Sequence, residues 1–461
     1  MIVTFLYAFS IFSVTYFALL GAWYTTLLLA SFPEVLKKFR ETTYGNIEHL
    51  IDVQSLIPIT IVTPAFNEEK RILNMVNSIL QSHYKNVHMI IVSDGSTDGT
   101  IALLDREFHL EEVPVIIRET IPTEKIRHCY VSKRNSNLMV LDKEHSPWHC
   151  AADSVNAGFN ACQTPVMLTI DADTVLEPEA LSRMMFTFLT KSHCVAVSGS
   201  VYVLNDNIVE NGKLLTSVLP EHFISAVQGV EYLRSFLYGR AGLNVFGGAM
   251  CYPGAFTLFE TECLRDVGGY DTQNFSYDAE IITKIHHYMR KNKFPHTLNH
   301  SPNAFSWTEV PSTLKSFWNQ RDKWQRGMWR SVMRHIGMFF NPRYGIVGMI
   351  TFPAYIFFEV LGPVIECLTF ITLVIAWILG DINVTVLLWF LFLAWGYITL
   401  VSVAMVFLNL ISFNRYRRWT DTFRVIGLVF AEMFGFRQFR AVCCTVATVK
   451  YMFNRARSKP L

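Results

Sequence analysis

Charged residues are scarce in this chain of 461 residues: only 17% are Asp, Glu, Lys or Arg, whereas 51% are hydrophobic and 14% are aromatic. Soluble chains usually carry about 25% charged residues, so this composition predicts that part of the chain lies in a membrane. The formal net charge is only +2, and no basic run is interleaved with aromatic residues. Nucleic acid is therefore not indicated as a partner.

Paired cysteine motifs are also lacking. The nine cysteines include no Cys-x-x-Cys pair, which excludes the usual zinc-site spacing and gives no sign of a secreted disulfide framework. The adjacent Cys443 and Cys444 are interpreted as small apolar fillers. A reducing cytosol suits such a set of cysteines.

The first 31 residues contain no charged residue. This stretch exceeds the roughly 20 apolar residues that cross a bilayer, so it predicts a membrane helix. Lys37, Lys38 and Arg40 follow at once, which predicts that the next segment is cytoplasmic and the N-terminus outside. A cleaved signal peptide is the alternative, but the stretch lacks a basic start and a small-residue cleavage pattern.

From Pro58 onward, short apolar segments alternate with segments of helical pattern, as expected of a parallel sheet covered by helices. The clearest strand begins at Val166 and stops at two carboxylates, Asp171 and Asp173. Ligands of such sheets bind beyond the carboxyl ends of the strands. Because alternate residues of an extended segment point the same way, both acids and a diphosphate would hold one divalent cation through oxygen ligands. A surface turn is the alternative.

Two earlier strands also end in acids and small turn residues. The first is followed by Asn67-Glu68-Glu69, and the second ends in Asp94-Gly-Ser-Thr-Asp-Gly99. Asp94 is suited to accept hydrogen bonds from a base or ribose, and the glycines allow the backbone to approach a ligand. Each motif alone is also ordinary turn chemistry, so it is their order along the chain that predicts a nucleotide cleft.

This order of motifs resembles that of the family 2 glycosyltransferases. The shared features are a strand that ends near Asn-Glu-Glu, a strand that ends in Asp-Gly-Ser-Thr-Asp, and an Asp-x-Asp about seventy residues later. Further shared motifs lie at residues 153–158, 231–234, 254–256, 268–270, 278 and 320–327. They cover nearly the whole chain. Within the family, the chain is most similar to bacterial synthases of extracellular polysaccharides such as poly-N-acetylglucosamine, hyaluronan and cellulose, which include biofilm exopolysaccharides.

The resemblance implies an α/β GT-A nucleotide-sugar-binding domain joined to an α-helical multi-pass membrane region. It implies that Asp173 binds a divalent cation, Mg²⁺ or Mn²⁺, and that Asp278 is the general base. Asp278 also opens a helical pattern, so the role of a helix N-cap is compatible with the same residue. Contacts with the nucleotide-sugar are implied for Glu68, for Asp94 on the uridine, for Asp153, and for Asp171 on the side of the sugar and ribose.

Three features depart from the family pattern. Tyr277 stands where a Glu usually precedes the general base, and Ala151 stands where relatives carry a Lys close to the nucleotide. Either another cation nearby replaces that Lys, or the affinity is lower. The segment from Glu119 to Cys150 is longer and more polar than a usual connection. We interpret it as an insertion that forms a mobile flap, with a solvated surface loop as the alternative.

The segment from Pro311 to Phe340 has aromatic residues at helical spacing among Lys and Arg, which is typical of a helix at a membrane interface. It contains the family's Gln-x-x-Arg-Trp signature with Lys in place of Arg. Lys carries a point charge, whereas Arg can bind two oxygens at once, so this exchange is expected to affect ligand binding. The resemblance implies that the contacts with the acceptor or the diphosphate come from Gln320, Arg321, Lys323 and Trp324.

Two long apolar runs follow, Tyr344 to Gly380 and Val384 to Phe413. Arg343 and Arg417 flank them and are predicted to be cytoplasmic, so two crossings with Asp381 outside are the simplest topology.

The first run contains Pro353 and Pro363 and is predicted to be a broken or interfacial piece that leads into one span. Glu359 within it is expected to face protein or an aqueous path rather than lipid. Charges recur from Trp419 to Arg455, which predicts amphipathic helices on the cytoplasmic face.

The predicted parts are an N-terminal transmembrane helix, a cytoplasmic GT-A domain, interfacial helices, transmembrane segments and a cytoplasmic amphipathic tail, at residues 1–33, 55–310, 311–343, 344–413 and 414–461. The predicted function is inverting, metal-dependent transfer of a hexosyl or N-acetylhexosaminyl group from a UDP-sugar to a growing β-linked polysaccharide at the cell membrane. The sugar, the linkage and any accessory membrane subunits stay open.

Two alternatives are compatible with the same motifs. A non-processive enzyme of this fold would add one sugar to a lipid acceptor, and product length distinguishes it. A binding or regulatory homologue would have lost catalysis, but the retained acids argue against it, namely Asp94, Asp171, Asp173 and Asp278.

Overall fold

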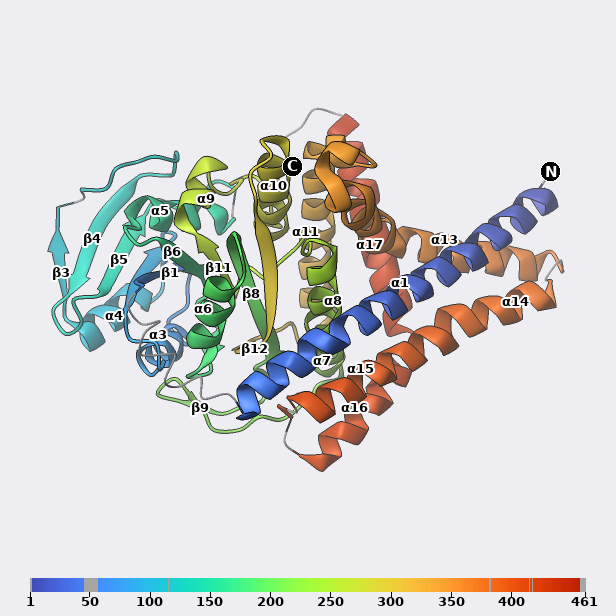
Figure 1. Ribbon diagram of the computed structural model, residues 1–461, viewed down its shortest axis with the longest axis horizontal. Helices are drawn as coiled ribbons and strands as arrows, with labels where there is room; N and C mark the ends of the chain where they lie inside the picture. The colour runs from blue at the N-terminus through green and yellow to red at the C-terminus, as the bar shows by residue number, and fades with distance from the viewer. Residues whose placement is uncertain are drawn as a thin grey trace.

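Figure 1 shows an α/β body beside an arm of long helices, with the N-terminus at the far end of the arm. Asp381 and Arg417, on which the predicted topology rests, lie outside the described residues, and so does residue 55, where the predicted catalytic domain starts. The computed structural model describes residues 2–44, 57–114, 116–148, 150–380, 383–413, 415–416 and 418–456.

A mixed sheet of ten strands forms the centre of the α/β body, in the order β3-β4-β5-β2-β1-β6-β11-β8-β12-β7. The predicted parallel arrangement of the strands before the acids is confirmed, because β1 pairs in parallel with both β2 and β6. On its other side β6 pairs antiparallel with β11, which makes the sheet mixed. The strands are β1 (Ile59–Ala65), β2 (Val87–Ser93), β3 (Leu110–Val113), β4 (Ile126–Ser132), β5 (Leu138–Lys143), β6 (Val166–Thr169), β7 (Val175–Leu176), β8 (Cys194–Val203), β11 (Thr257–Glu260) and β12 (Thr297–Thr308).

Alternation along the central strands divides their side chains between two apolar layers. On β1, Ile61 packs into the layer under α3, α4 and α6, whereas its neighbour Val62 packs into the layer under α5, α9 and α10. The sheet is thus buried on both faces, as expected of strands that are continuously apolar. These helices are α3 (Ile72–Leu80), α4 (Thr100–Phe108), α5 (Ala152–Ala161), α6 (Ala180–Thr190), α9 (Thr261–Asp266) and α10 (Tyr277–Lys291).

The segment predicted to be an inserted flap or a solvated loop is part of the sheet, so both interpretations were wrong. β5 pairs in parallel with β2, and β4 pairs antiparallel with β5. The polar residues that suggested a loop lie on the outer part of the sheet, where Arg127 is 42% exposed and pairs with Asp142 at 3.0 Å. Since β5 runs parallel to β2, its last residue, Lys143, lies at the same sheet edge as Asp94.

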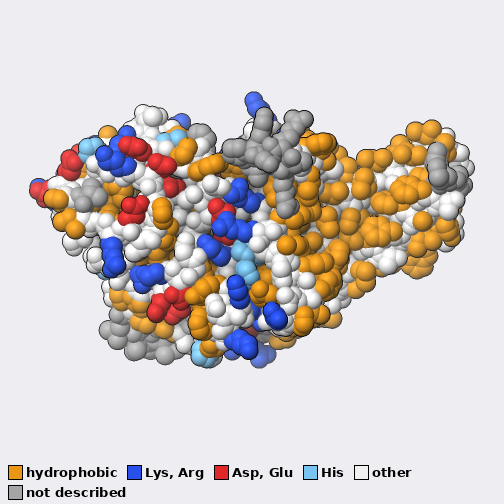
Figure 2. Space-filling model, turned by 90° about the horizontal axis from the view of Figure 1, so that it is seen from above, with side chains coloured by type: hydrophobic (Ala, Val, Ile, Leu, Met, Phe, Trp, Pro, Cys, Tyr) orange, Lys and Arg blue, Asp and Glu red, His pale blue; other side chains and the backbone are white. Residues whose placement is uncertain are grey.

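The helical arm contains the candidate membrane segments. Thr4–Thr42 of α1 (Ile2–Tyr44) and Val384–Ser412 are long and apolar enough to cross a membrane, and Val347–Val360 with Gly362–Ile378 makes a third if this pair, bent by 44°, is one span. The bend precedes Pro363, in agreement with the predicted broken piece. Figure 2 shows an arm surface of mostly hydrophobic side chains, unlike the mixed surface of the body.

Helix α11 (Leu314–Arg334), which carries the predicted interfacial segment, packs between α10 and α17 (Phe436–Ala456). It starts after Thr313, whose side chain accepts a hydrogen bond from the Ser316 amide at 3.2 Å, while the Ser316 hydroxyl accepts one from the Thr313 amide at 3.3 Å. The predicted C-terminal tail also contains α16 (Trp419–Ala431), which comes before α17 in the chain. α16 exposes large aromatic side chains, with Trp419 75% exposed.

Candidate active site

Acidic side chains from three parts of the chain act on one another at the carboxyl edge of the central strands. β6 ends at Thr169, and Asp171 and Asp173 follow it directly. Burial raises the pKa of Asp171, and the negative charges of Asp173, Asp278 and Glu68 raise it further. The structure therefore brings together four of the acids that the sequence analysis selected, with an excess of negative charge.

A side chain at the end of strand β12 binds Asp173. Thr308 donates a hydrogen bond to Asp173 Oδ1 at 2.9 Å, and Thr174 donates to the same oxygen at 3.4 Å. Burial raises the pKa of Asp173, while the hydrogen bond from Thr308 lowers it. Because both hydrogen bonds fall on Oδ1, the other carboxylate oxygen is available to a ligand.

Arg71 is a cation whose charge acts on Glu68 and Asp173 of this cluster. Its guanidinium lies 3.5 Å from Glu68 and 2.7 Å from Glu309. Burial and the charge of Asp173 raise the pKa of Glu68, and Arg71 lowers it. Since Arg71 is 42% exposed, water screens its charge, and it offsets the cluster only in part.

The residues of this edge fit a divalent cation that completes its coordination with other oxygens. Among the described residues, no three His, Cys, Asp or Glu side chains group closely enough to form a metal site by themselves. Mg²⁺ is commonly bound by one or two carboxylates together with phosphate oxygens and water. The raised pKa values of Asp171 and Asp173 mark negative charge that such a cation would offset.

Asp278 lies in the first turn of α10, which begins at Tyr277, so Asp278 is not the N-cap; Ser276 precedes the helix. Its Oδ1 accepts a hydrogen bond from the Ala279 amide at 2.9 Å. Burial raises the pKa of Asp278, while backbone amides and the charge of Arg240 lower it. A carboxylate of this kind, with a raised pKa, is suited to accept a proton.

Close contact between α10 and α11 brings Asp278 near Trp324. The Ser276 hydroxyl donates to the Trp324 carbonyl at 3.1 Å. One turn further, a Cβ on Gly327 would come within 2.5 Å of the Ser276 amide, so only glycine allows the two backbones to approach this closely. Tyr277, the departure from the family pattern, lies half-buried with its ring against Tyr270 at 5.8 Å between centroids.

The four signature residues of α11 have different surroundings. Arg321 is buried and forms a two-pronged ion pair with Glu231, at 2.7 and 3.1 Å, while its guanidinium lies 4.4 Å from the ring centre of Trp324. Arg321 therefore orients Trp324 from within the protein. Gln320 and Trp324 are half-buried, and Lys323 is exposed.

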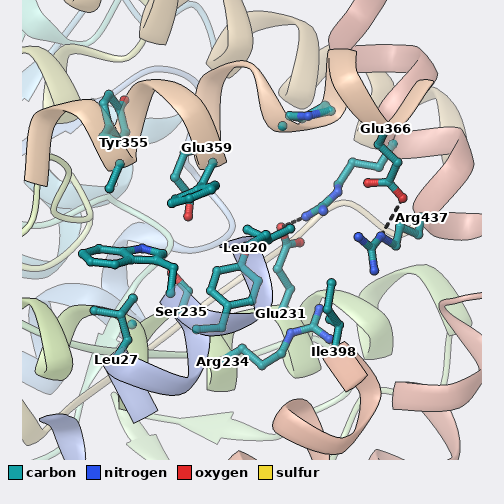
Figure 3. Close-up of a pocket in the computed structure, with 18 of the residues that line it drawn as sticks. Leu20, Leu27, Glu231, Arg234, Ser235, Tyr355, Glu359, Glu366, Ile398 and Arg437 are labelled. Carbon is teal, nitrogen blue, oxygen red and sulfur yellow. Dashed lines mark hydrogen bonds and ion pairs between the residues drawn. The ribbon is translucent and has the colours of Figure 1, made fainter. Parts of the chain in front are cut away.

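A cavity of about 350 Å³ lies between this site and the helical arm. Its lining includes Trp324, Arg240 and aromatic residues of the candidate membrane segments such as Trp23 and Tyr355. Figure 3 shows Glu231 and Arg234 on one wall and Glu359 on the opposite one. Glu359 thus faces a protein cavity, as its position in an apolar run predicted.

Ion pairs between residues of the cavity wall leave few of its charges unbalanced. Arg437 pairs with Glu366 at 2.6 Å, and Arg440 reaches Glu231 at 3.0 Å. Arg234 pairs with Glu432 through a second two-pronged contact. These pairs join α7 (Phe223–Leu233) and its continuation to the last two helices and the arm.

Asp94 and Asp153 lie apart from the acid cluster, on either side of Lys143. The Lys143 ammonium pairs with Asp94 and lies 2.7 Å from Asp153, with its side chain fully buried. His145 Nδ1 lies 2.8 Å from Asp94 Oδ2 and 2.9 Å from the Asp94 carbonyl oxygen, and the His145 ring stacks on Phe66 at 4.7 Å between centroids. Asp153 is thus buried next to a cation, apart from the acid cluster.

The sequence analysis missed Lys143. Its signal was present: Leu138 to Leu141 is an apolar run that ends in Asp142-Lys143, in the same way that β6 ends in acids. The polar segments on both sides hid this strand, because they made the whole stretch look like a loop.

The chain belongs to the family of glycosyltransferases whose model is described as "Glycosyltransferase like family 2", which matches residues 57–327. Its relatives include a poly-beta-1,6-N-acetyl-D-glucosamine synthase of Staphylococcus epidermidis, 23% identical over 298 residues, or 65% of this chain and 60% of that protein. The enzyme of the same name from Staphylococcus aureus (strain COL) is 24% identical over 296 residues, or 64% and 60%. The chain spans about 60% of the length of the curated relatives it matches.

A solved structure supports the fold. The mannosyltransferase PcManGT from Pyrobaculum calidifontis, in complex with GDP-Man and Mn²⁺, is similar with a TM-score of 0.50 and 13% identity, over 95% of this chain and 99% of that chain. The predicted GT-A-like α/β fold is thereby confirmed.

Proposed function

We propose that this chain is an inverting glycosyltransferase that moves N-acetylglucosamine from UDP-N-acetylglucosamine to the end of a growing β-linked polysaccharide. The family supports the reaction class, and the synthases of poly-beta-1,6-N-acetyl-D-glucosamine among its relatives support the sugar and the polymer. The observation that carries the proposal is the contact of α10, which carries Asp278, with α11, whose Trp324 lines the cavity.

The chemistry follows from the properties of Asp278. The acceptor hydroxyl gives its proton to the Asp278 carboxylate, and its oxygen forms a bond with the anomeric carbon of the donor sugar. The bond from this carbon to the diphosphate breaks, and UDP leaves with the electron pair. Because the oxygen attacks from the face opposite to the diphosphate, the configuration at the carbon is inverted.

Asp173 and Asp171 would hold a divalent cation, Mg²⁺ or Mn²⁺, together with the diphosphate. Such a cation supplies positive charge that offsets the charge developing on the leaving UDP. The residues themselves contribute position: Thr308 donates to Oδ1 of Asp173, so that Oδ2 would be the oxygen that binds the cation.

The cavity is proposed to receive the acceptor. Trp324 offers an aromatic face to the terminal sugar, and Trp23 and Tyr355 offer further apolar surface toward the arm. A lipid-linked acceptor is the second candidate, because the cavity is also lined by helices that are apolar enough for a membrane. Product size separates polymer synthesis from the addition of a single sugar.

We further propose a multi-pass arrangement in the cell membrane with the catalytic domain in the cytoplasm. The spans would be α1, the bent pair and Val384–Ser412, with basic residues on the cytoplasmic side. A cysteine placed at Leu379, at the end of α13 (Gly362–Ile378), should react with an impermeant thiol reagent outside the cell, and one at Arg418 should not. The reverse pattern of labelling would contradict this topology.

The reaction is tested with the purified full chain and a panel of UDP-sugars. We expect UDP release with UDP-N-acetylglucosamine, together with a product of high molecular mass on a sizing gel. UDP release from no sugar in the panel, or transfer without growth of a polymer, would overturn the proposed activity or its processive form, respectively.

A further inference from the structure

Lys143, at the end of β5, is a buried cation whose hydrogen-bond donors are all used. An ammonium has three N–H donors, and this one has three acceptors: Asp94 Oδ1, Asp153 at 2.7 Å and the Glu144 carbonyl at 2.7 Å. The side chain is 0% exposed. Lys143 therefore has no donor left for a phosphate, and any role it has in ligand binding acts through Asp94 or Asp153.

Lys143 makes the two oxygens of the Asp94 carboxylate unequal. Oδ1 accepts from Lys143 and also from the Ser146 amide at 3.2 Å, so this oxygen is fully engaged. Oδ2 is contacted by the His145 ring at 2.8 Å, and this ring is 32% exposed beside Phe66. Asp94 thus presents one oxygen, Oδ2, toward the aromatic pair formed by His145 and Phe66.

We propose that Lys143 determines which base is accepted, by limiting Asp94 to a single acceptor for a nucleobase that stacks beside Phe66. Uracil has one imide N–H between two carbonyl groups and matches a single oxygen. Guanine has two neighbouring N–H groups, which pair best with both oxygens of a carboxylate, and cytosine has no N–H at this ring position. The inference rests on the proposed use of a nucleotide-sugar and specifies its base.

Lys143 also holds the start of α5, the helix that begins at Ala152, against β5. Asp153, in the first turn of that helix, binds Lys143 and also accepts from the Glu124 amide at 3.3 Å. The ion pair therefore ties β2, β5 and the start of α5 together around Asp94.

The test compares base selectivity with folding. UDP, GDP and CDP are titrated calorimetrically into the full chain in detergent, for the wild type, Lys143→Met, and Lys143→Met combined with Asp153→Asn. The wild type should bind UDP at least tenfold tighter than GDP or CDP. Lys143→Met should weaken UDP binding by about tenfold, the scale of one charged hydrogen bond, and GDP binding far less.

The double variant separates positioning from stability. Lys143→Met leaves the charge of Asp153 buried without a partner, and replacing Asp153 by Asn removes that charge. The melting temperature of the double variant should therefore recover, while its preference for UDP stays lost. A purely structural role predicts that the preference recovers with stability. Arg127→Met is the matched control, because Arg127 pairs with Asp142 next to Lys143 and should leave selectivity unchanged.

Two results would overturn the inference: a wild type without preference for UDP, or a double variant that keeps the wild-type preference. Both are read from binding, whereas the proposed activity is read from transfer. A chain that binds UDP selectively through Lys143 but transfers no sugar would refute the activity and leave this inference standing.

Discussion

The two ends of the sheet edge differ in how their charges are balanced. At the end proposed to bind the nucleotide, called the nucleotide end, Lys143 lies between Asp94 and Asp153, and its donors are all used. At the end proposed to carry out catalysis, called the catalytic end, burial and the charges of Asp173, Asp278 and Glu68 raise the pKa of Asp171. One end is complete without a ligand, and the other retains excess negative charge.

This difference indicates what each end does. A buried carboxylate whose Oδ1 is held by Lys143 is fixed in direction, which suits the recognition of a base by hydrogen bonds to Oδ2. A cluster of acids without enough cations is destabilised until positive charge arrives, which suits the binding of a divalent cation together with a diphosphate. Substitutions at one end should therefore change its function without changing that of the other end.

The largest effect is expected for Asp173→Asn. It removes the charge proposed to hold the cation, so transfer should fall below detection and the metal-dependent part of UDP binding should disappear. Radiolabelled sugar transfer and titration of UDP with and without Mn²⁺ measure the two effects. Full activity would contradict the metal role of Asp173.

Stability should not fall in the same variant. A raised pKa means that the ionised form of an acid is unfavourable in the folded chain, so this cost is present above the folded pKa and absent at acid pH. Removing the charge of Asp173 lowers the cost of ionising Asp171. The melting temperature at pH 7 should therefore be equal to or higher than that of the wild type. Glu309→Gln is the control: it also removes a negative charge beside Asp173, but one that is paired with Arg71, and it should leave activity in place.

Asp278→Asn should slow transfer by a factor of ~10² or more, the usual contribution of a general base. The affinity for the UDP-sugar should be retained, because the amide keeps the shape of the side chain and its hydrogen bond from Ala279. Single-turnover kinetics and donor titration give the two values. Loss of both together would indicate that Asp278 supports the structure of α10 instead.

Trp324→Ala should reduce polymer synthesis by roughly tenfold or more, because it removes the surface that positions the attacking hydroxyl. Donor affinity should be unchanged, and slow hydrolysis of the UDP-sugar by water should persist. Polymer yield, free sugar and donor binding are measured side by side. Chains of normal length at the normal rate would leave Trp324 with only a packing role against Arg321.

The smallest effect is a shift in the pH profile of Arg240→Met. Arg240 lowers the pKa of Asp278, which burial raises, so its removal should raise this pKa further. A general base must be ionised, and the acid limb of kcat/KM should therefore move to higher pH. A shift to lower pH, or none, would show that Asp278 does not limit the rate at acid pH.

Much of the fold could be predicted because local pattern and tertiary position agree. The apolar runs that end in Asp94 and Asp171 are strands with both faces buried, and their polar ends can only face the cleft. The stretch from Glu119 to Cys150 was misread because β4 lies near the edge of the sheet, where exposed polar side chains are stable.

The site was predicted less completely, because ion pairs join residues that are distant in sequence. Lys143 has no acid partner nearby in the chain; its partners lie 49 residues before it in Asp94 and on the next helix in Asp153. Arg321 was expected to contact the acceptor or the diphosphate, yet it is buried against Glu231, 90 residues earlier. The spacing of residues along the chain does not predict a pairing of this kind. The contact of Arg321 with the acceptor or the diphosphate stays a prediction.

The most direct test of the contrast between the two ends is the titration of uridine and of UDP into the wild-type chain, each with Mn²⁺ and with chelator. If the nucleotide end is complete and only the catalytic end requires a cation, uridine should bind equally in both conditions, while UDP should bind about tenfold tighter with Mn²⁺. A dependence of uridine binding on Mn²⁺, or UDP binding that ignores the metal, would contradict the account.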